Sequence, residues 1–194
     1  MALDHLRSND FWRKKLHLAV SVQDVNKDGC VSREDFDMIV KRYKDAGASE
    51  EHVKKHQESF EKLYVIWGMT DKSTKLTHQQ FEEMFQDNLE KSFSHADELY
   101  SEWFHQVDIN ENGEISLDEW KIHSSALGIS DKDAEASYRA MDANKDGTIS
   151  MEEFIDYHKE FFFSAKDDLH SSILYGPLNW TSKVDNALTY IASY

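Results

Sequence analysis

The sequence contains few of the residues that interrupt helices and a single residue that could form a disulfide. Its 194 residues include one Pro, seven Gly and one Cys. A lone cysteine excludes an internal disulfide, and the first 30 residues lack the apolar run of a signal peptide. Residue 2 is Ala, whereas myristoylation requires Gly, and no run of about 18 apolar residues could span a bilayer. We therefore expect a cytoplasmic protein with no stable membrane anchor.

Basic residues are scarce relative to acidic ones. The chain has 22 Lys and Arg against 37 Asp and Glu, which gives a formal net charge of −15. This charge argues against nucleic acid or anionic membrane as the main partner and makes cations the natural counterpart. The long uninterrupted segments of helix-forming residues lack the alternating pattern of strands, so the sequence predicts an all-α fold.

One twelve-residue pattern occurs three times. It reads DVNKDGCVSRED at 24–35 (loop one), DINENGEISLDE at 108–119 (loop three) and DANKDGTISMEE at 142–153 (loop four). Each copy matches D-x-[DN]-x-[DN]-G with an acid at position twelve, which is the EF-hand loop. Oxygens at positions 1, 3, 5, 7, 9 and 12 surround one hard cation, and Gly at position six permits the sharp turn. The sequence therefore predicts three Ca²⁺ sites.

The ligand sets of the three loops differ in charge. The candidate ligands are Asp24, Asn26, Asp28, the Cys30 carbonyl, Ser32 and Asp35 in loop one; Asp108, Asn110, Asn112, the Glu114 carbonyl, Ser116 and Glu119 in loop three; and Asp142, Asn144, Asp146, the Thr148 carbonyl, Ser150 and Glu153 in loop four. By carboxylate count loop three is the weakest for calcium, although pairing with loop four can offset this. Asp35 is one methylene shorter than Glu, which favours monodentate contact and six-coordination. Loop one is therefore predicted to be a mixed Ca²⁺/Mg²⁺ site with lower calcium preference than loop four.

A fourth unit, MTDKSTKLTHQQ at 69–80 (loop two), keeps the frame but has lost the ligands. Met69 stands at position one, Thr74 at position six and Gln80 at position twelve, and none of these meets the requirement of its position. Leu76 keeps the apolar position eight, and Thr77 with Gln80 keeps the S/T-x-x-E/Q form of a helix capping box. We expect a metal-free unit that pairs with loop one through the position-eight residues.

The spacing of the loops predicts two pairs of helix-loop-helix units. We assign an N-terminal pair to 1–88 and a C-terminal pair to 97–166, followed by an apolar tail at 167–194 that we expect to pack on the body. The joining segment 86–98 lacks the Pro, Gly and Ser richness of a free tether, so the two pairs are predicted to pack into one compact globule. The tail residues suited to covering an apolar surface are Ile173, Leu174, Tyr175, Leu178 and Trp180.

Taken together, these residues resemble the invertebrate sarcoplasmic calcium-binding proteins, including the calexcitins. The resemblance covers about residues 8–178 and rests on the three intact loops, the degenerate loop two, the SNDFWRKKL segment, Asp35 and the LYGPL segment. It implies a cytosolic Ca²⁺ and Mg²⁺ buffer. We expect a monomer, and find no serine-protease, zinc or phosphate-loop pattern that would predict an enzyme.

Two alternatives remain open. A calcium sensor exposes a Met-rich groove to protein targets, but the six methionines here are scattered, which favours a buffer. The broader group that the sequence resembles also includes photoproteins and coelenterazine-binding proteins, and Trp120, His123, His158 and Phe162 could line a ligand cavity. We favour core packing for these four residues because aromatic side chains at helical spacing are typical of a core. In the photoproteins a proline ends the chain, whereas Pro177 is internal here, which argues against light emission.

Overall fold

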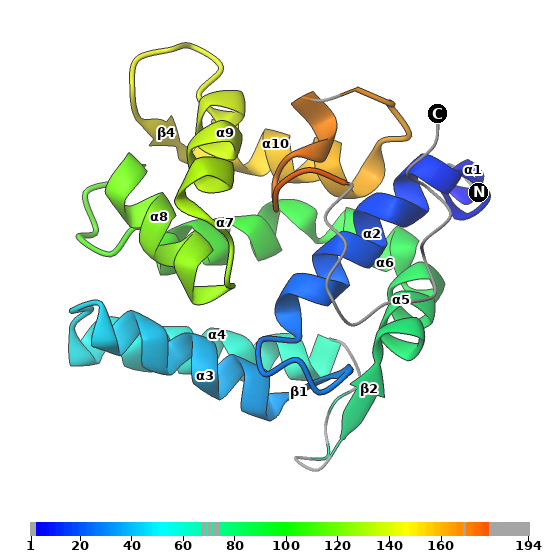
Figure 1. The fold of residues 1–194 in the computed structure, drawn as a ribbon, viewed down its shortest axis with the longest axis horizontal. Helices are drawn as coiled ribbons and strands as arrows, with labels where there is room; N and C mark the ends of the chain where they lie inside the picture. Colours follow the sequence, from blue (N-terminus) through cyan, green and yellow to red (C-terminus); the bar gives the residue numbers. More distant parts are fainter. Residues whose placement is uncertain (1–2, 67–68, 70, 72–73, 169, 179–194) are drawn as a thin grey trace.

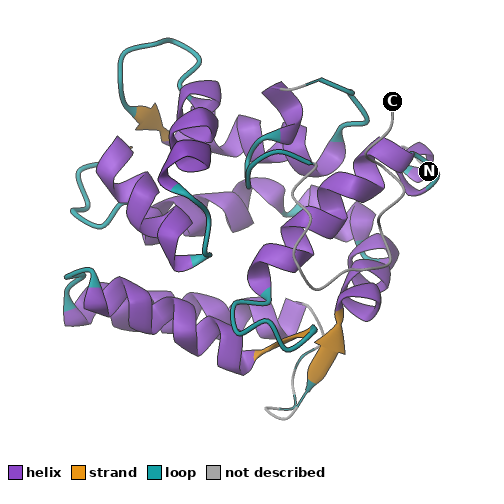
Figure 2. Ribbon diagram, viewed as in Figure 1, coloured by secondary structure: helices purple, strands orange, loops and turns teal. Residues whose placement is uncertain are grey.

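The structure, a computed structural model, describes residues 3–66, 69, 71, 74–168 and 170–178. Helices dominate these residues, as the sequence predicted, and each strand is two or three residues long (Figure 2). The elements follow in this order: α1 (Asp4–Arg7), α2 (Asp10–Gln23), β1 (Cys30–Ser32), α3 (Arg33–Asp45), α4 (Glu50–Ile66), β2 (Lys75–Thr77), α5 (His78–Asp87), α6 (Leu89–Ser94), α7 (Ala96–Val107), β3 (Glu114–Ile115), α8 (Leu117–Ala126), α9 (Asp131–Met141), β4 (Ile149–Ser150), α10 (Met151–Phe163) and the 3₁₀ turn η1 (His170–Ser172).

The helix that leaves each loop begins at a capping box. The first backbone N–H groups of a helix have no intrahelical partner, and a side chain at the cap supplies one. In the degenerate unit the Thr77 N–H donates to Gln80 Oε1 at 3.0 Å, and the Gln80 N–H donates to Thr77 Oγ1 at 3.2 Å. The predicted capping box of loop two is therefore confirmed, and α5 begins without any acid at position twelve. The other three boxes are formed by Ser32 with Asp35, Ser116 with Glu119, and Ser150 with Glu153.

Short antiparallel strands join the loops in pairs. In the N-terminal pair β1 lies beside β2 with Val31 opposite Leu76, and in the C-terminal pair β3 lies beside β4 with Ile115 opposite Ile149. All four are position-eight residues, as the sequence predicted, and Val31, Ile115 and Ile149 are fully buried. Figure 1 places β1 and β2 at one end of the molecule and β4 at the other.

The two pairs pack against each other along a seam of buried side chains. Tyr43 on α3 hydrogen bonds through its hydroxyl to His123 Nδ1 on α8 at 2.6 Å. On the other side α2 lies against α10, where the Trp12 Nε1–H donates to the Phe162 carbonyl at 2.7 Å. The short helix α6 and its flanking turns connect the pairs, so no long exposed helix separates them in the described residues (Figure 1). The predicted compact all-α fold is confirmed.

Aromatic residues form much of the core. Phe36, Trp120 and Phe154, which directly follow position twelve of loops one, three and four, are at most 2 % exposed. In the tail Leu174 and Tyr175 are buried, and the Tyr175 ring lies 5.4 Å from that of Phe161. Ile173 and Leu178 are half-buried, and Leu178 packs against the core, whereas Trp180 lies in 179–194, outside the described residues. The proposed domain limits remain a prediction. No helix among the described residues is long and apolar enough to cross a membrane.

Candidate cation sites and an interior pocket

Loops one, three and four share the same hydrogen-bond network around the first carboxylate. In loop one the Asp24 carboxylate accepts the N–H groups of Asp28 at 3.1 Å and Gly29 at 3.0 Å. The equivalent bonds from positions five and six end on Asp108 and Asp142 at 2.9 to 3.2 Å. The side chain at position three accepts the position-five N–H in all three loops as well. The loop is thus folded around its own ligand oxygens.

The backbone of each of these loops turns twice through the left-handed region. In loop one Lys27 at position four has φ 62° and Gly29 at position six has φ 88°. Glycine adopts this region without the Cβ clash that other residues meet, which explains the glycine at position six. Position four carries the same strain in all three loops, with φ 57° at Glu111 and 61° at Lys145. The loops therefore share one backbone shape as well as one network.

The acid at position twelve closes each loop. Asp35 accepts the Asn26 N–H at 3.1 Å through Oδ1, and the Ser32 N–H at 2.9 Å through Oδ2. Glu119 and Glu153 accept the same two donors in their loops. Burial raises the pKa of Asp35 despite these hydrogen bonds, and its side chain is fully buried. At Glu153 burial raises the pKa as well, but hydrogen bonds led by that of the Ser150 N–H outweigh it and lower the pKa. The shorter acid reaches the same donors from a more deeply buried position.

The structure brings the predicted ligands of each loop together within that loop. Among the described residues no three His, Cys, Asp or Glu side chains form a ready-made metal cluster. Asn and Ser oxygens and a backbone carbonyl complete an EF-hand site, and all of its ligands are oxygens, the type that Ca²⁺ and Mg²⁺ prefer. At position one, Asp108 and Asp142 accept a single N–H on each carboxylate oxygen, which leaves a second acceptor position on each oxygen for a cation. The three ligand sets therefore fit a hard divalent cation.

Loop two departs from this arrangement where its residues are described. Met69 at position one is fully buried, and its N–H donates to the Tyr64 carbonyl at 2.7 Å. Two side chains of this unit and its exit helix contact loop one. Lys75 Nζ lies 3.1 Å from Asp28 Oδ2, and His78 Nε2 lies 3.0 Å from Asp24 Oδ2. The Lys75 hydrogen bond, followed by that of the Cys30 N–H, lowers the pKa of Asp28.

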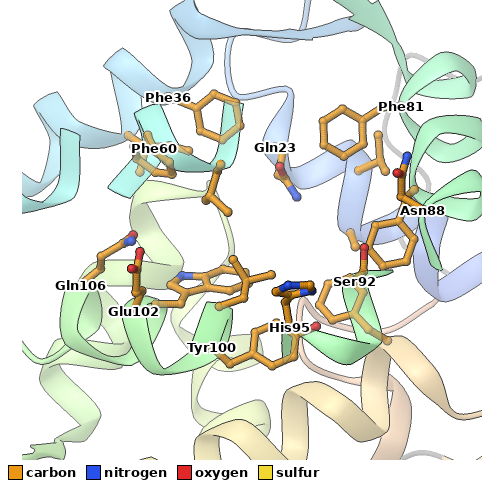
Figure 3. A pocket seen from close by; sticks show the side chains of 18 of the residues that line it. Gln23, Phe36, Phe60, Phe81, Asn88, Ser92, His95, Tyr100, Glu102 and Gln106 are labelled. Atoms are coloured by element: carbon orange, nitrogen blue, oxygen red, sulfur yellow. The ribbon is translucent and has the colours of Figure 1, made fainter. Parts of the chain in front are cut away.

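An interior pocket of about 210 Å³ lies between the two pairs. Figure 3 shows Phe36 and Phe60 on one side and Tyr100 on the other, with Gln23 pointing into the space between them. Of the four pocket candidates from the sequence, His123 and Phe162 line the pocket. Trp120 and His158 are buried but are not part of its wall, as the core interpretation predicted for them. No pattern in the sequence indicated that Gln23 or His56 would line a pocket.

The pocket is mostly apolar and carries buried polar atoms that have no partner. Gln23 Oε1, His56 Nδ1 and His123 Nε2 make no hydrogen bond to any described residue. Burial lowers the pKa of His56 and of His123 to about 3, so both rings are neutral near pH 7. Unsatisfied buried polar atoms are costly, and an uncharged ligand with complementary donors and acceptors would satisfy them.

The chain is similar in sequence and in fold to known proteins. The EF hand family model matches residues 99–122 and 139–156, within the C-terminal pair. The sarcoplasmic calcium-binding protein of Perinereis vancaurica tetradentata is 30 % identical over 88 % of this chain and 99 % of its own. Aequorin-2 of Aequorea victoria is 29 % identical over 73 % of this chain and 78 % of its own. The calcium-loaded apo form of the coelenterazine-binding protein of Renilla muelleri superimposes with a TM-score of 0.73, at 25 % identity, over 86 % of this chain and 94 % of that one. The chain belongs to the EF-hand family of calcium-binding proteins.

Proposed function

We propose that the protein is a Ca²⁺ and Mg²⁺ buffer of the sarcoplasmic calcium-binding type, with cation sites in loops one, three and four. The observation that carries this proposal is the network repeated in the three loops, from the position-one carboxylate to the position-twelve acid. Mg²⁺ competes chiefly at loop one, where the final acid is Asp35. A cytoplasmic, monomeric protein is part of the same proposal.

A buffer fits the described surface better than a sensor does. A sensor uses an apolar groove that calcium exposes to its targets. Among the described residues the large hydrophobic side chain left exposed is that of Phe93, at 44 %. The tail also covers part of the apolar surface, since Leu174 and Tyr175 are buried and Tyr175 packs on Phe161, so a buffer is the preferred function. Retention on a hydrophobic resin only in calcium, and not in magnesium or chelator, would instead support a sensor.

Calorimetric titration of the full chain tests the three sites. We expect three bound Ca²⁺ ions, with a weaker apparent affinity at one site in about millimolar Mg²⁺. Asp142→Asn should remove one ion, because the position-one ligand loses its charge. Asp71→Asn is the matched control at an exposed position of loop two, and it should leave the count at three. Four bound ions, or loss of an ion in the control, would contradict the assignment.

A second candidate function is the carriage of an organic ligand in the interior pocket. It is favoured by the unpaired Gln23, His56 and His123 atoms, together with the likeness to a coelenterazine-binding protein. The volume of about 210 Å³ is below the roughly 300–1,000 Å³ of typical ligand pockets, so the pocket would have to expand to hold a ligand of that size. Because the pocket is smaller than typical ligand pockets, we rank ligand carriage second to cation binding.

Coelenterazine is the probe for this second function. Binding should quench the tryptophan fluorescence, since Trp103 lines the pocket. Gln23→Leu should weaken binding because it removes a buried acceptor, while Gln79→Leu, at an exposed position on α5, should not. No quenching in the unaltered protein would reject ligand carriage without affecting the cation sites, and equal quenching in both variants would reject the role of Gln23.

A further inference from the structure

Loop two places a positive charge beside loop one. The antiparallel register sets Lys75, at position seven of loop two, opposite Ser32, at position nine of loop one. The Lys75 ammonium lies 3.1 Å from Asp28 Oδ2 and 3.2 Å from Glu34 Oε2. Asp28 is the predicted position-five ligand of loop one, so this lysine contacts a side chain that would also hold the cation.

The C-terminal pair has a charge of opposite sign at the equivalent place. There the same register sets Glu114, at position seven of loop three, opposite Ser150, at position nine of loop four. Position seven contributes only its carbonyl to its own loop, so its side chain is free to vary in charge. The pairing nevertheless sets that residue opposite position nine of the partner loop. Loop four therefore has an acid as its neighbour where loop one has a base.

We infer that Lys75 sets the cation affinity of loop one, acting as a fixed positive charge supplied by the metal-free second unit. This inference rests on the proposed binding of cations by loop one. A divalent cation must approach Asp28 against the lysine charge, which lowers affinity. Because both ions carry a charge of +2 and would occupy the same loop at a similar distance from the ammonium, Ca²⁺ and Mg²⁺ are weakened by similar factors. The effect of Lys75 thus differs from that of Asp35, which acts on the choice between the two ions through ligand geometry.

The position-six glycine amides report on the three loops separately. The amide groups of Gly29, Gly113 and Gly147 each donate to the position-one carboxylate of their own loop. Their NMR signals therefore follow the cation titration of loops one, three and four in the full chain. Titrations with Ca²⁺ alone and with Mg²⁺ alone give a midpoint for each loop and each ion.

Removing the charge should tighten loop one. In Lys75→Met we expect the Gly29 midpoint to fall by about two- to fivefold for both ions, the range typical of exposed ion pairs. Lys75→Glu should lower it by about tenfold, because the charge is reversed. Both effects should fade at about 0.5 M salt, where the screening length is only a few ångströms. The Gly113 and Gly147 midpoints should not change.

Two further variants separate the effect of a charge beside the loop from the effect of the total charge of the protein. Lys54→Met removes an exposed lysine of the same half that pairs with Glu58 on α4, and it should leave the Gly29 midpoint unchanged. Glu114→Lys places a base beside loop four and should raise the Gly147 midpoint for both ions. Each variant alters an exposed side chain, and circular dichroism should show unchanged helix content.

The outcomes distinguish the inference from the function on which it rests. If the Gly29 signal titrates but its midpoint is the same in the unaltered protein, Lys75→Met and Lys75→Glu, the inference is wrong and the cation site stands. A change for one ion only would also overturn it, because a charge cannot discriminate between two divalent ions. If Gly29 does not respond to either ion in the unaltered protein, the cation site in loop one and the inference both fail.

Discussion

The N-terminal pair contains one complete loop and one degenerate loop, whereas the C-terminal pair contains two complete loops. Both pairs nevertheless form the same two-stranded contact at position eight and the same capping boxes. Thr77 with the neutral Gln80 makes the two bonds that Ser150 makes with Glu153. The architecture of a pair is thus separable from its ability to hold a cation, because the degenerate unit forms its strand pairing and its capping box without an acid at position twelve.

The comparison also shows what a unit without metal can still contribute. At position one, loop two has the buried Met69 where each complete loop has an aspartate. This position therefore contributes to the apolar core and supplies no oxygen for a cation. At the same time it directs Lys75 and His78 toward loop one. The C-terminal pair places the acid Glu114 opposite loop four instead. The two pairs therefore share a frame and differ in the charges that the frame presents.

Acid should produce the largest effect, since it acts on histidines buried where the two pairs meet. Burial lowers the pKa of His56 and His123 to about 3, and burial, opposed by the Phe154 carbonyl, lowers that of His158 to about 4. The unfolded chain, with histidine pKa near 6.5, binds more protons below that pH. The free energy of unfolding should therefore be greatest above about pH 6.5 and fall toward pH 4, by up to about 1.4 kcal/mol per pH unit for each histidine.

Denaturant titration in chelator at several pH values measures this loss without interference from bound metal. His158→Phe, at a position that contacts no predicted cation ligand, should make the free energy of unfolding depend less steeply on pH. The decrease in slope should correspond to one bound proton. Phe93→Leu, at an exposed position that carries no titrating group, is the control and should leave the slope unchanged. A free energy of unfolding that does not vary between pH 7 and pH 4.5 would contradict the neutral, buried state of these rings.

The next effect in size is expected at position twelve of the C-terminal pair. Glu153→Gln removes the charge of the predicted bidentate ligand. It should weaken cation binding by loop four by more than the roughly 10–100-fold that follows from the loss of a residue that only supports a metal ligand. The helix α10 should persist, because Gln can still cap Ser150 as Gln80 caps Thr77. Calorimetry should therefore count one ion fewer at unchanged helix content.

The reverse change in the N-terminal pair should have no comparable effect. Gln80→Glu restores the acid of loop two, but Met69 at position one is buried and supplies no oxygen. The expected count of bound ions stays at three. A fourth ion in this variant would mean that one acid suffices for binding, and the distinction between the two pairs would be lost.

A smaller effect should follow from exchanging the acid of loop one. In the unaltered protein the Asp35 carboxylate accepts the Asn26 and Ser32 N–H groups, and Asp35→Glu lengthens this side chain by one methylene. A bidentate contact favours calcium, so the ratio of Ca²⁺ to Mg²⁺ affinity should rise on the order of tenfold, one decade of the range over which EF-hand sites are tuned. Parallel Ca²⁺ and Mg²⁺ titrations followed at Gly29 measure the ratio. An unchanged ratio would show that the length of this acid does not set selectivity.

The smallest effect is expected from the capping residues. Thr77→Ala should cost about 1 kcal/mol of stability, typical of a lost N-cap, with no change in cation binding. Ser150→Ala should cost a similar amount in chelator and should also weaken loop four, where Ser150 is a predicted ligand. Thermal denaturation with and without calcium separates the two contributions. Equal behaviour of the two variants in calcium would remove Ser150 from the ligand set.

Residues that are close in sequence made much of the protein predictable. The ligands of one loop lie within twelve consecutive residues, so their spacing alone indicates the chemistry, as in Asp24 to Asp35. Capping boxes span four residues, and position eight of each loop is apolar because it pairs across the two-stranded contact. Helical spacing of aromatic side chains likewise indicated buried positions, including those of Trp120 and Phe162.

Contacts between side chains that are far apart in sequence were decided only by the tertiary structure. Lys75 meets Asp28 across 47 positions of sequence, and Tyr43 meets His123 across 80. The pocket similarly combines Gln23 of α2 with His56 of α4 and His123 of α8. Periodicity states that a side chain is buried or exposed, but not which distant side chain it meets, because that depends on how the helices cross and how the strands register. The sequence by itself thus determined the loops and their chemistry, while the charge beside loop one and the interior pocket arose from the packing of distant segments.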